Sequence, residues 1–406
     1  MNARAIERTA RGAVESIARG ARGWSRDPRW LVPVAAVAWA ALAVYTRLGT
    51  RYSLDLQVYR SAAAALRAGR DPYTGLFTQH HLPFTYPPFA LLVFVPVSFG
   101  PAAVVEAAWW TLNAACTVGV VYLLLTRGMR MEPRLAWLRA FVAAPVLCLA
   151  LEPLRSNLDY GQINAALLLA VLYDLLAVRP GRRGILVGLA AAVKLTPAIF
   201  VIYFVVSRDG RAVLRSLASF GVATALGVAV LPSESRMFWA HDVVQPARTG
   251  PIASPLNQSL YGMLHRWPAH RFDHALWIAV VVVVGALGSV LAWSLLQRQQ
   301  RVAAVIALGL TGELISPVSW THHWIWVMAL PVLIVTMPRD GRRTMSVIAA
   351  MVAVVAVACL APYTWTTSGW AARAAADSLV GLGLVLLVVW ATCEVSGRTT
   401  RRRVVA

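Results

Sequence analysis

Hydrophobic residues gather in long runs along most of the chain, separated by short polar connections. A helix needs about 20 predominantly apolar residues to cross the hydrocarbon core of a bilayer, and most of the runs approach that length. The pattern therefore predicts an all-α polytopic membrane protein with about 11–12 transmembrane helices. The runs cover residues 30–48, 101–126, 135–151, 164–178, 185–206, 215–231, 276–297, 302–317, 324–337, 344–361 and 378–395.

Two apolar segments depart from this simple pattern. The run 185–206 contains Lys194 and Pro197, and proline removes a backbone donor and promotes a helix break. This run is either one kinked helix or two half-helices, and the alternation of charged connections favours two half-helices. The segment 89–99 is too short to span a bilayer comfortably, so we expect a re-entrant or interfacial helix there.

Arginines cluster in the terminal segments and in alternate connections between the apolar runs. The positive-inside rule places these basic segments in the cytoplasm. The remaining connections, including loops 47–100 and 232–275, then face the periplasm, and together they hold all eight histidines. We therefore expect a basic cytoplasmic tail at 1–29, a single transmembrane domain at 30–395 and a second basic tail at 396–406.

Composition agrees with a bilayer environment. The chain of 406 residues is 58% hydrophobic and 14% charged, whereas soluble domains are close to half apolar and a quarter charged. The formal net charge of +20 follows the loop topology, so nucleic acid is not an expected partner, whereas membrane lipids are. The four cysteines form no CxxC pair, and the chain has no Walker A motif, Rossmann fingerprint or nucleophile elbow.

The first candidate site residues lie in the first outer loop. Asp55 follows the first apolar run closely, and a partly desolvated carboxylate at the membrane interface is suited to accept a proton. An ordinary helix cap or solvated loop acid is the alternative interpretation. Tyr86 precedes Pro87 and Pro88, a sequence that favours a rigid entry turn with interfacial aromatics over direct catalysis by the tyrosine.

Further polar residues occur at predicted outer helix ends and inside one apolar run. Gln162 and Asn164 carry amides, which bind sugar hydroxyls or cap helices. Lys194 is the only lysine and lies within an apolar run, where an ionisable residue indicates a functional site. A compact ammonium suits a phosphate, although it can also serve as the structural partner of a buried carboxylate.

The long outer loop and a late helix mouth supply the remaining candidates. Asn257 and Gln258 lie in the loop, and Trp320, His322 and His323 follow further along. Adjacent residues diverge by about 100° on a helix, so we expect only one of the two histidines to face a site. Imidazole suits hydrogen bonding or charge donation to an anionic group, with tryptophan forming a sugar-stacking wall; an interfacial aromatic belt is the alternative. Adjacent histidines do not have metal-ligand spacing, and no metal site is predicted.

Taken in order along the chain, these segments resemble glycosyltransferase family 87, the polyprenol-phosphate-mannose-dependent mannosyltransferases of mycobacteria and their relatives. The resemblance covers nearly the whole chain, and within the family the enzymes that act on phosphatidylinositol mannosides are the closest in pattern. It rests on Asp55, Tyr86-Pro87-Pro88, Gly161-Gln162-Ile163-Asn164, Lys194 with Pro197, Asn257-Gln258-Ser259, and Ser316-Pro317 through His322-His323.

The resemblance implies a GT-C membrane fold in the plasma membrane, with the active site facing the periplasm. It implies transfer of mannose from polyprenol phosphate mannose to a phosphatidylinositol mannoside, with inversion, an α-1,2 linkage and no cofactor. Asp55 would be the general base, and His322 would contact the leaving phosphate. The substrate-binding residues would be Lys194, His323, Gln162, Asn164, Tyr86, Asn257, Gln258 and Trp320.

Three alternatives to this function stay open at the level of sequence. A related enzyme that adds α-1,2-mannose branches to lipomannan or lipoarabinomannan differs only in acceptor choice, which depends on groove shape. A glycolipid transporter or flippase would also use broken helices and an intramembrane lysine. A non-catalytic membrane scaffold would have silent substitutions at Asp55 and His322.

Overall fold

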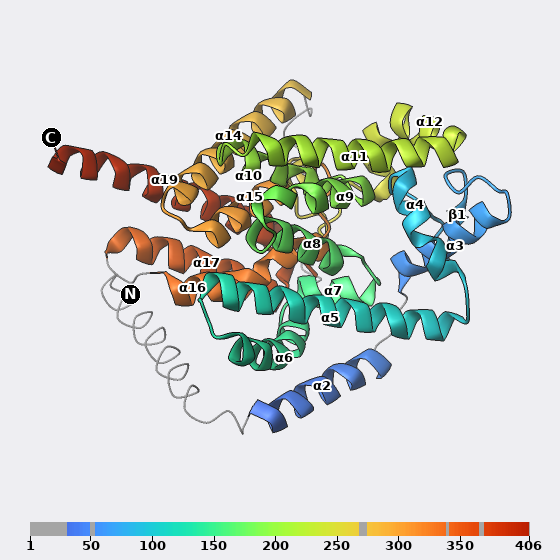
Figure 1. The fold of residues 1–406 in the computed structure, drawn as a ribbon, viewed down its shortest axis with the longest axis horizontal. Coiled ribbons are helices and arrows are strands. Elements are labelled where there is room, and N and C mark those ends of the chain that lie inside the picture. The colour runs from blue at the N-terminus through green and yellow to red at the C-terminus, as the bar shows by residue number, and fades with distance from the viewer. Residues whose placement is uncertain (1–30, 49–52, 268–273, 338–340, 365–368, 406) are drawn as a thin grey trace.

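The computed structural model describes residues 31–48, 53–267, 274–337, 341–364 and 369–405, and these are almost entirely helical (Figure 1). The basic tail expected at 1–29 lies outside the described residues. The long helices are α2 (Leu31–Leu48), α5 (Ala102–Gly128), α6 (Pro133–Ala150), α11 (Gly210–Val230), α14 (His274–Gln297), α15 (Arg301–Ile315), α17 (Arg342–Leu360) and α19 (Ser378–Val405).

Short helices join the long ones, and the described residues form one small pair of antiparallel strands. The pair consists of β1 (Leu76–Phe77) and β2 (Leu82–Pro83). The short α-helices are α3 (Leu54–Arg67), α4 (Pro88–Phe94), α7 (Glu152–Asp159), α8 (Asn164–Leu176), α9 (Ile185–Val193), α10 (Val201–Val206), α12 (Pro232–Ala240), α13 (Leu260–Arg266), α16 (Leu330–Thr336) and α18 (Gly369–Ala376). The 3₁₀ helices are η2 (Val95–Ser98), η3 (Pro180–Arg182), η4 (Thr196–Phe200), η5 (Asp242–Val244), η6 (Pro246–Thr249), η7 (Thr321–Ala329) and η8 (Pro362–Thr364).

Helix length and exposed apolar surface identify the chain as a multi-pass membrane protein. Among the described residues, five helices are long and apolar enough to cross a bilayer, and a pair bent by 55° around residue 377 makes a sixth. Their outer faces are apolar: Val222 on α11 and Val283 on α14 are 72% and 65% exposed. Such surface is stable against lipid. The all-α polytopic fold is thus confirmed, whereas the total of 11–12 crossings stays a prediction.

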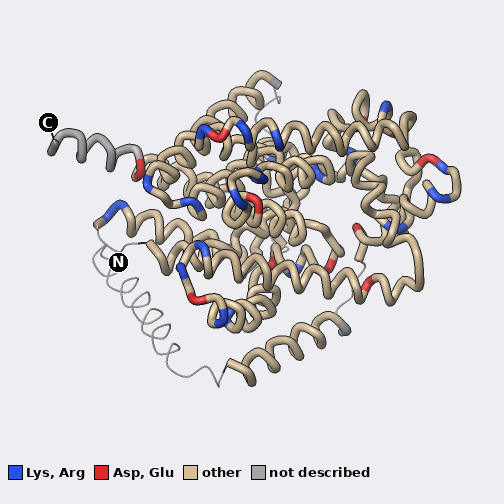
Figure 2. The backbone as a smooth tube through the Cα atoms, in the orientation of Figure 1, with Lys and Arg blue, Asp and Glu red and all other residues tan. Residues whose placement is uncertain are grey.

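Charged positions avoid the middle of α5, α11, α14 and α17, whereas α6 carries Arg139 and α19 carries Glu394 inside the helix (Figure 2). α5 carries Glu106 and Arg127 towards its two ends, and α11 carries its charged residues, Arg211 and Arg215, in its first turns. Capping fixes where two of these helices begin: the Glu132 carboxylate accepts from the backbone N–H groups of Arg134 and Leu135, and Asp209 accepts from Ala212. These caps satisfy backbone N–H groups that have no partner within their own helix.

The segment 185–206 forms two half-helices, as the charge alternation favoured. The backbone of Lys194 is extended, with φ −149° and ψ 127°, and it separates α9 from η4 and α10. Both ends of the segment lie at the start of α11, because Arg215 donates to the carbonyl oxygens of Pro180 and Arg183 at one end and α10 leads directly into α11 at the other. The chain therefore turns back at Lys194.

Small residues allow the first half-helix to pack closely against α11. A Cβ atom on Gly188 would lie 2.1 Å from the carbonyl oxygen of Ser216. The Asp174 carboxylate accepts from the backbone N–H groups of Gly184 and Val187 at the start of α9. A carboxylate at a helix N-terminus stabilises the unpaired amides and the positive end of the helix dipole. These contacts fix the depth at which Lys194 is held.

Two apolar segments form short helices. The segment 89–99 forms α4 followed by η2, in agreement with a short helix there, while its position at the membrane surface stays a prediction. The run 324–337 was expected to be a continuous helix, but it begins within η7 and becomes α-helical only at Leu330. Pro331, at the start of α16, has no backbone N–H to continue an α-helical ladder upstream.

Candidate functional site

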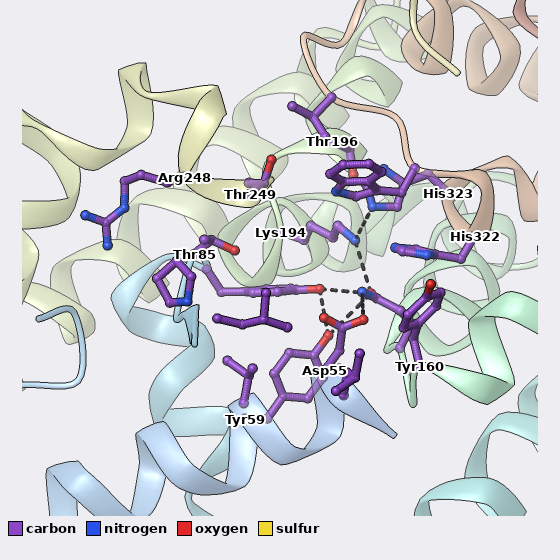
Figure 3. A pocket seen from close by; sticks show the side chains of 18 of the residues that line it. Asp55, Tyr59, Thr85, Tyr160, Lys194, Thr196, Arg248, Thr249, His322 and His323 are labelled. Carbon is purple, nitrogen blue, oxygen red and sulfur yellow. Dashed lines mark hydrogen bonds between the residues drawn. The ribbon is translucent and has the colours of Figure 1, made fainter. Parts of the chain in front are cut away.

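A cavity of about 430 Å³ lies where α3, the Pro87–α4 entry, the α7–α8 turn, the break at Lys194 and η7 meet (Figure 3). Segments that are far apart in the sequence therefore share one site. Its lining combines polar and apolar side chains, and Figure 3 shows Asp55, Lys194 and His322 grouped near one another with Arg248 and Thr249 across the cavity from His322. Of the predicted site residues, it is lined by Asp55, Tyr86, Gln162, Lys194, Trp320, His322 and His323.

Asp55 is held at the start of α3 by the turn that follows α7. Its backbone N–H donates to the Tyr160 carbonyl oxygen at 2.9 Å. Gly161 permits this approach, since it has φ +67° and an added Cβ would lie 2.8 Å from the Cβ of Leu56. Desolvation raises the pKa of Asp55 to about 6, against the opposing effects of a hydrogen bond from Gln162 and the charge of Lys194. The carboxyl therefore titrates just below neutral pH, as a base at neutral pH requires.

Gln162 is the hub of the hydrogen-bond network beside Asp55. Its Nε2 donates to Asp55 Oδ2 at 2.7 Å. Its Oε1 accepts from Tyr86 at 3.0 Å, from Tyr59 at 3.3 Å and from Lys194 Nζ at 3.4 Å. These donors fix the orientation of the amide, so that its N–H group points at the carboxylate.

Tyr59 belongs to the site, although the sequence analysis did not select it. Its hydroxyl lies 2.7 Å from the hydroxyl of Tyr86, and its ring stacks on Phe94. Burial raises the pKa of both tyrosines, so both hydroxyls stay protonated and can donate. Tyr59 lies four residues after Asp55, on the same face of α3, and this spacing was the signal that could have identified it.

Lys194 points into the cavity from the break between α9 and η4 (Figure 3). Its Nζ contacts Asn164 Oδ1 at 2.8 Å and His323 Nε2 at 3.0 Å, in addition to Gln162. Within the described part of the chain, Lys194 forms no ion pair with a carboxylate; the buried Glu313 instead accepts from the hydroxyl of Ser319 at 2.8 Å. The interpretation of Lys194 as half of a buried ion pair therefore finds no support in these contacts.

Both histidines face the cavity, so the expectation that only one would do so was wrong. Their rings lie 4.8 Å apart at an interplanar angle of 77°. They occupy the first turn of η7. Both side chains line the cavity there, although neighbouring side chains on a helix diverge. Both ring nitrogens of the buried His322 lack a partner among the described residues, which leaves this imidazole available to a ligand.

A partly buried acid, Glu152, supports the histidine segment from outside the cavity. Glu152 accepts from the Tyr363 hydroxyl at 2.7 Å and from the Thr321 hydroxyl at 3.0 Å. Thr321 directly precedes His322, and Asn164 donates to the His322 carbonyl oxygen at 3.0 Å. These positioning residues come from three distant segments, so sequence spacing gave no signal for Glu152 or Tyr363.

Asn257 and Gln258 lie outside the cavity lining, and both are fully buried. The Asn257 side chain donates to Ile252 and accepts from the backbone N–H of Ser319. Gln258 donates to the Ala376 carbonyl oxygen and accepts from the backbone N–H of Val380. The two amides thus hold the long loop against the segment before η7 and the start of α19. Trp320, by contrast, lines the cavity.

The lining combines a base with a group of nitrogen donors. Asp55 can take a proton from a hydroxyl, while Lys194, His322 and His323 can hold an anionic group beside it. Leu54, Val58 and other apolar residues around them suit a lipid-linked ligand. Among the described residues, no three His, Cys, Asp or Glu side chains cluster in a way that could hold a metal ion.

Comparison with known proteins identifies the family. The sequence model of Glycosyltransferase family 87 matches residues 84–317, more than half of the chain. A polyprenol-phosphate-mannose-dependent alpha-(1-2)-phosphatidylinositol mannoside mannosyltransferase of Mycobacterium tuberculosis is 33% identical over 402 residues, which is 92% of each chain. Its counterpart in Mycolicibacterium smegmatis is 35% identical over 77% of this chain and 76% of its own. A pentamannoside mannosyltransferase of M. tuberculosis is 34% identical over 76% of this chain and 74% of its own. The chain belongs to glycosyltransferase family 87.

Proposed function

We propose that the protein is a membrane mannosyltransferase that uses polyprenol phosphate mannose as donor and a phosphatidylinositol mannoside as acceptor. The relatives carry these two substrates and an α-1,2 linkage in their names. The observation that carries the proposal here is one cavity that joins the Asp55 carboxylate to Lys194, His322 and His323. A sugar transfer from a lipid phosphate needs a base on one side and stabilisation of the departing phosphate on the other.

The reaction is a direct displacement. Asp55 takes the proton from a hydroxyl of the acceptor sugar as that oxygen attacks the anomeric carbon of the β-linked mannose. The bond from the anomeric carbon to the phosphate oxygen breaks, and the polyprenyl phosphate leaves with the bonding electrons. Attack from the opposite face inverts the configuration and gives an α linkage. The pKa of about 6 keeps Asp55 ionised at neutral pH while leaving it basic enough to share a proton.

The leaving phosphate is stabilised by nitrogen donors that the fold holds in place. His322 provides a buried imidazole without a protein partner, and Lys194 provides positive charge. His323 contacts Lys194 Nζ and fixes its direction. Such preorganised groups stabilise charge as it develops, because they need no reorientation during the reaction.

The remaining predicted residues bind the sugars or hold the residues that do so. Gln162 aligns the base, and Tyr86 supports Gln162 through its hydroxyl. Asn164 acts through its contacts with Lys194 and the His322 carbonyl oxygen, and Trp320 offers a ring for sugar stacking. Asn257 and Gln258 contribute by holding the loop beside η7.

Orientation in the plasma membrane follows from the arginine distribution. The basic connections and both termini lie in the cytoplasm, and the cavity faces the periplasm. The catalytic domain spans 30–395, including outer loops 47–100 and 232–275, and 1–29 and 396–406 are cytoplasmic tails. The α19 helix continues through 396–405.

Acceptor choice separates the proposal from its nearest alternative. A lipomannan or lipoarabinomannan branching enzyme would use the same donor and the same base. The names of the relatives favour phosphatidylinositol mannosides. Assaying both acceptors with one purified preparation distinguishes the two functions.

Purified protein tests the proposal. With radiolabelled polyprenol phosphate mannose, it should transfer mannose to a phosphatidylinositol mannoside in detergent, where a transporter or flippase has no measurable activity. Asp55→Asn should lower the rate by about 10²–10⁴-fold while preserving donor binding. Asp71→Asn is the matched control, because Asp71 is an exposed acid of the same loop outside the cavity lining. Near-wild-type transfer by Asp55→Asn would refute the base assignment, and absence of transfer by the wild-type protein would refute the function.

A further inference from the structure

A second polar cavity lies at the end of the molecule away from α3 and α4 (Figure 1). Its volume is about 440 Å³. It is bounded by the ends of α14 and α16, by the start of α17 and by residues 390–394 inside α19. The lining side chains that carry a charge, an N–H donor or a thiol are those of Arg298, Arg342, Arg343, Trp390, Cys393 and Glu394. The catalytic cavity shares none of these residues.

The cavity carries an excess of positive charge. Arg298 pairs with Glu394 through Nε and Oε2 at 3.1 Å, which accounts for the only carboxylate in the lining. The exposed guanidinium groups of Arg342 and Arg343 form no hydrogen bond or ion pair with any residue that the structure describes. Planar guanidinium groups bind phosphate by paired N–H donors. Two such groups are therefore available to an anion.

A buried donor in the same cavity independently indicates a ligand. Trp390 is fully buried, it lines the cavity, and its Nε1–H has no partner within the described residues. Buried indole N–H groups normally find an acceptor. The first backbone N–H groups of α17 also lack partners within that helix and add their dipole to the site.

The location of the cavity indicates which kind of anion it binds. α14 and α17 are long apolar helices of membrane-spanning length, so their ends lie at a membrane surface. Met337 and Val347 supply apolar lining beside the arginines. Basic pockets between transmembrane helices recognise anionic lipid headgroups in this setting. We propose that this cavity binds the phosphodiester headgroup of an anionic phospholipid, with Arg342 and Arg343 as its principal ligands.

Cys393 gives a built-in readout of occupancy. Cys116 and Cys148 are buried, so in a Cys359→Ala background Cys393 is the one partly exposed cysteine of the four. The full-length protein is placed in nanodiscs of phosphatidylcholine alone or with phosphatidylglycerol. Alkylation of Cys393 by uncharged N-ethylmaleimide is then followed over time. We expect phosphatidylglycerol to slow alkylation on the order of tenfold, as a site filled well above its dissociation constant would.

Two variants and one soluble ligand distinguish a specific headgroup site from other causes of slower Cys393 alkylation. Arg342→Ala should abolish the protection, whereas Arg127→Ala, an exposed arginine outside the cavity, should retain it. Arg343 is left intact because it adjoins Cys393, whose thiol donates to its carbonyl oxygen, so a substitution there would change the surroundings of the reporter thiol directly. Inorganic phosphate in phosphatidylcholine nanodiscs should give no protection. Equal alkylation in both nanodiscs, unchanged protection in Arg342→Ala, or full protection by inorganic phosphate would each overturn the proposal.

Discussion

Replacing Gln162 with methionine should move the pH dependence of mannose transfer to higher pH. The Gln162 amide donates to Asp55 Oδ2 at 2.7 Å and thereby stabilises the ionised carboxylate. Methionine has a similar length and removes this donor. The pKa of Asp55, already raised to about 6 by burial, should then rise further.

The size of the shift follows from the strength of the lost hydrogen bond. A hydrogen bond to a charged group contributes about 1.5–3 kcal/mol, and one pKa unit corresponds to about 1.4 kcal/mol. Losing the bond should therefore raise the pKa by about 1–2 units. Because the base acts only when ionised, kcat/KM rises with pH through the pKa of the free enzyme. The rising limb should move from near pH 6 to about pH 7–8.

The assay measures kcat/KM of purified protein from about pH 5 to about pH 9 with saturating donor. Thr249→Val is the matched control, because Thr249 lines the same cavity and donates to the Pro246 carbonyl oxygen, without a hydrogen bond to Asp55. Its rising limb should coincide with that of the wild type. The reasoning would be refuted if Gln162→Met kept the wild-type limb or moved it to lower pH.

Three further predictions concern the phosphate, the support of η7 and metals. His322→Ala should weaken binding of polyprenol phosphate mannose and lower kcat by about a hundredfold, because it removes a preorganised imidazole beside the leaving phosphate. Intact binding and turnover would contradict the assignment of His322 to the phosphate. Glu152→Ala should lower the free energy of unfolding by about 1–3 kcal/mol, because the hydroxyls of Tyr363 and Thr321 lose their shared partner. Thermal unfolding measures this, with the partly exposed Glu234→Ala as control, and equal midpoints would contradict it. Mannose transfer in excess EDTA should equal that without EDTA. A strict requirement for Mg²⁺ or Mn²⁺ would contradict a reaction that uses no metal ion.

The helical framework was accessible from sequence because bilayer solvation acts on whole segments. Most of the long apolar runs correspond to one helix each, and the break at Lys194 agrees with the pair of half-helices that charge alternation favoured. The 3₁₀ start of the segment from Thr321 was not predicted. Hydrophobicity reports that a segment is buried or faces lipid, but not which hydrogen-bond ladder it adopts.

The site was predictable where a residue is chemically out of place, and less so where it is chemically ordinary. Asp55 and Lys194 stood out from their apolar surroundings, and both line the cavity. Asn257 resembled a substrate ligand because buried and ligand-binding amides look alike in sequence, yet it bonds to the backbone. Tyr59 could have been found from its helical spacing to Asp55, whereas Glu152 acts through contacts with residues 169 and 211 positions away, which no local pattern encodes.

A structure of the protein with polyprenol phosphate mannose bound is the most direct test of this account. The donor phosphate should lie within hydrogen-bond distance of His322 and within reach of Lys194, and the anomeric carbon should face the Asp55 carboxylate across the space left for the acceptor hydroxyl. A phosphate bound elsewhere, or a sugar turned away from Asp55, would contradict the proposed chemistry.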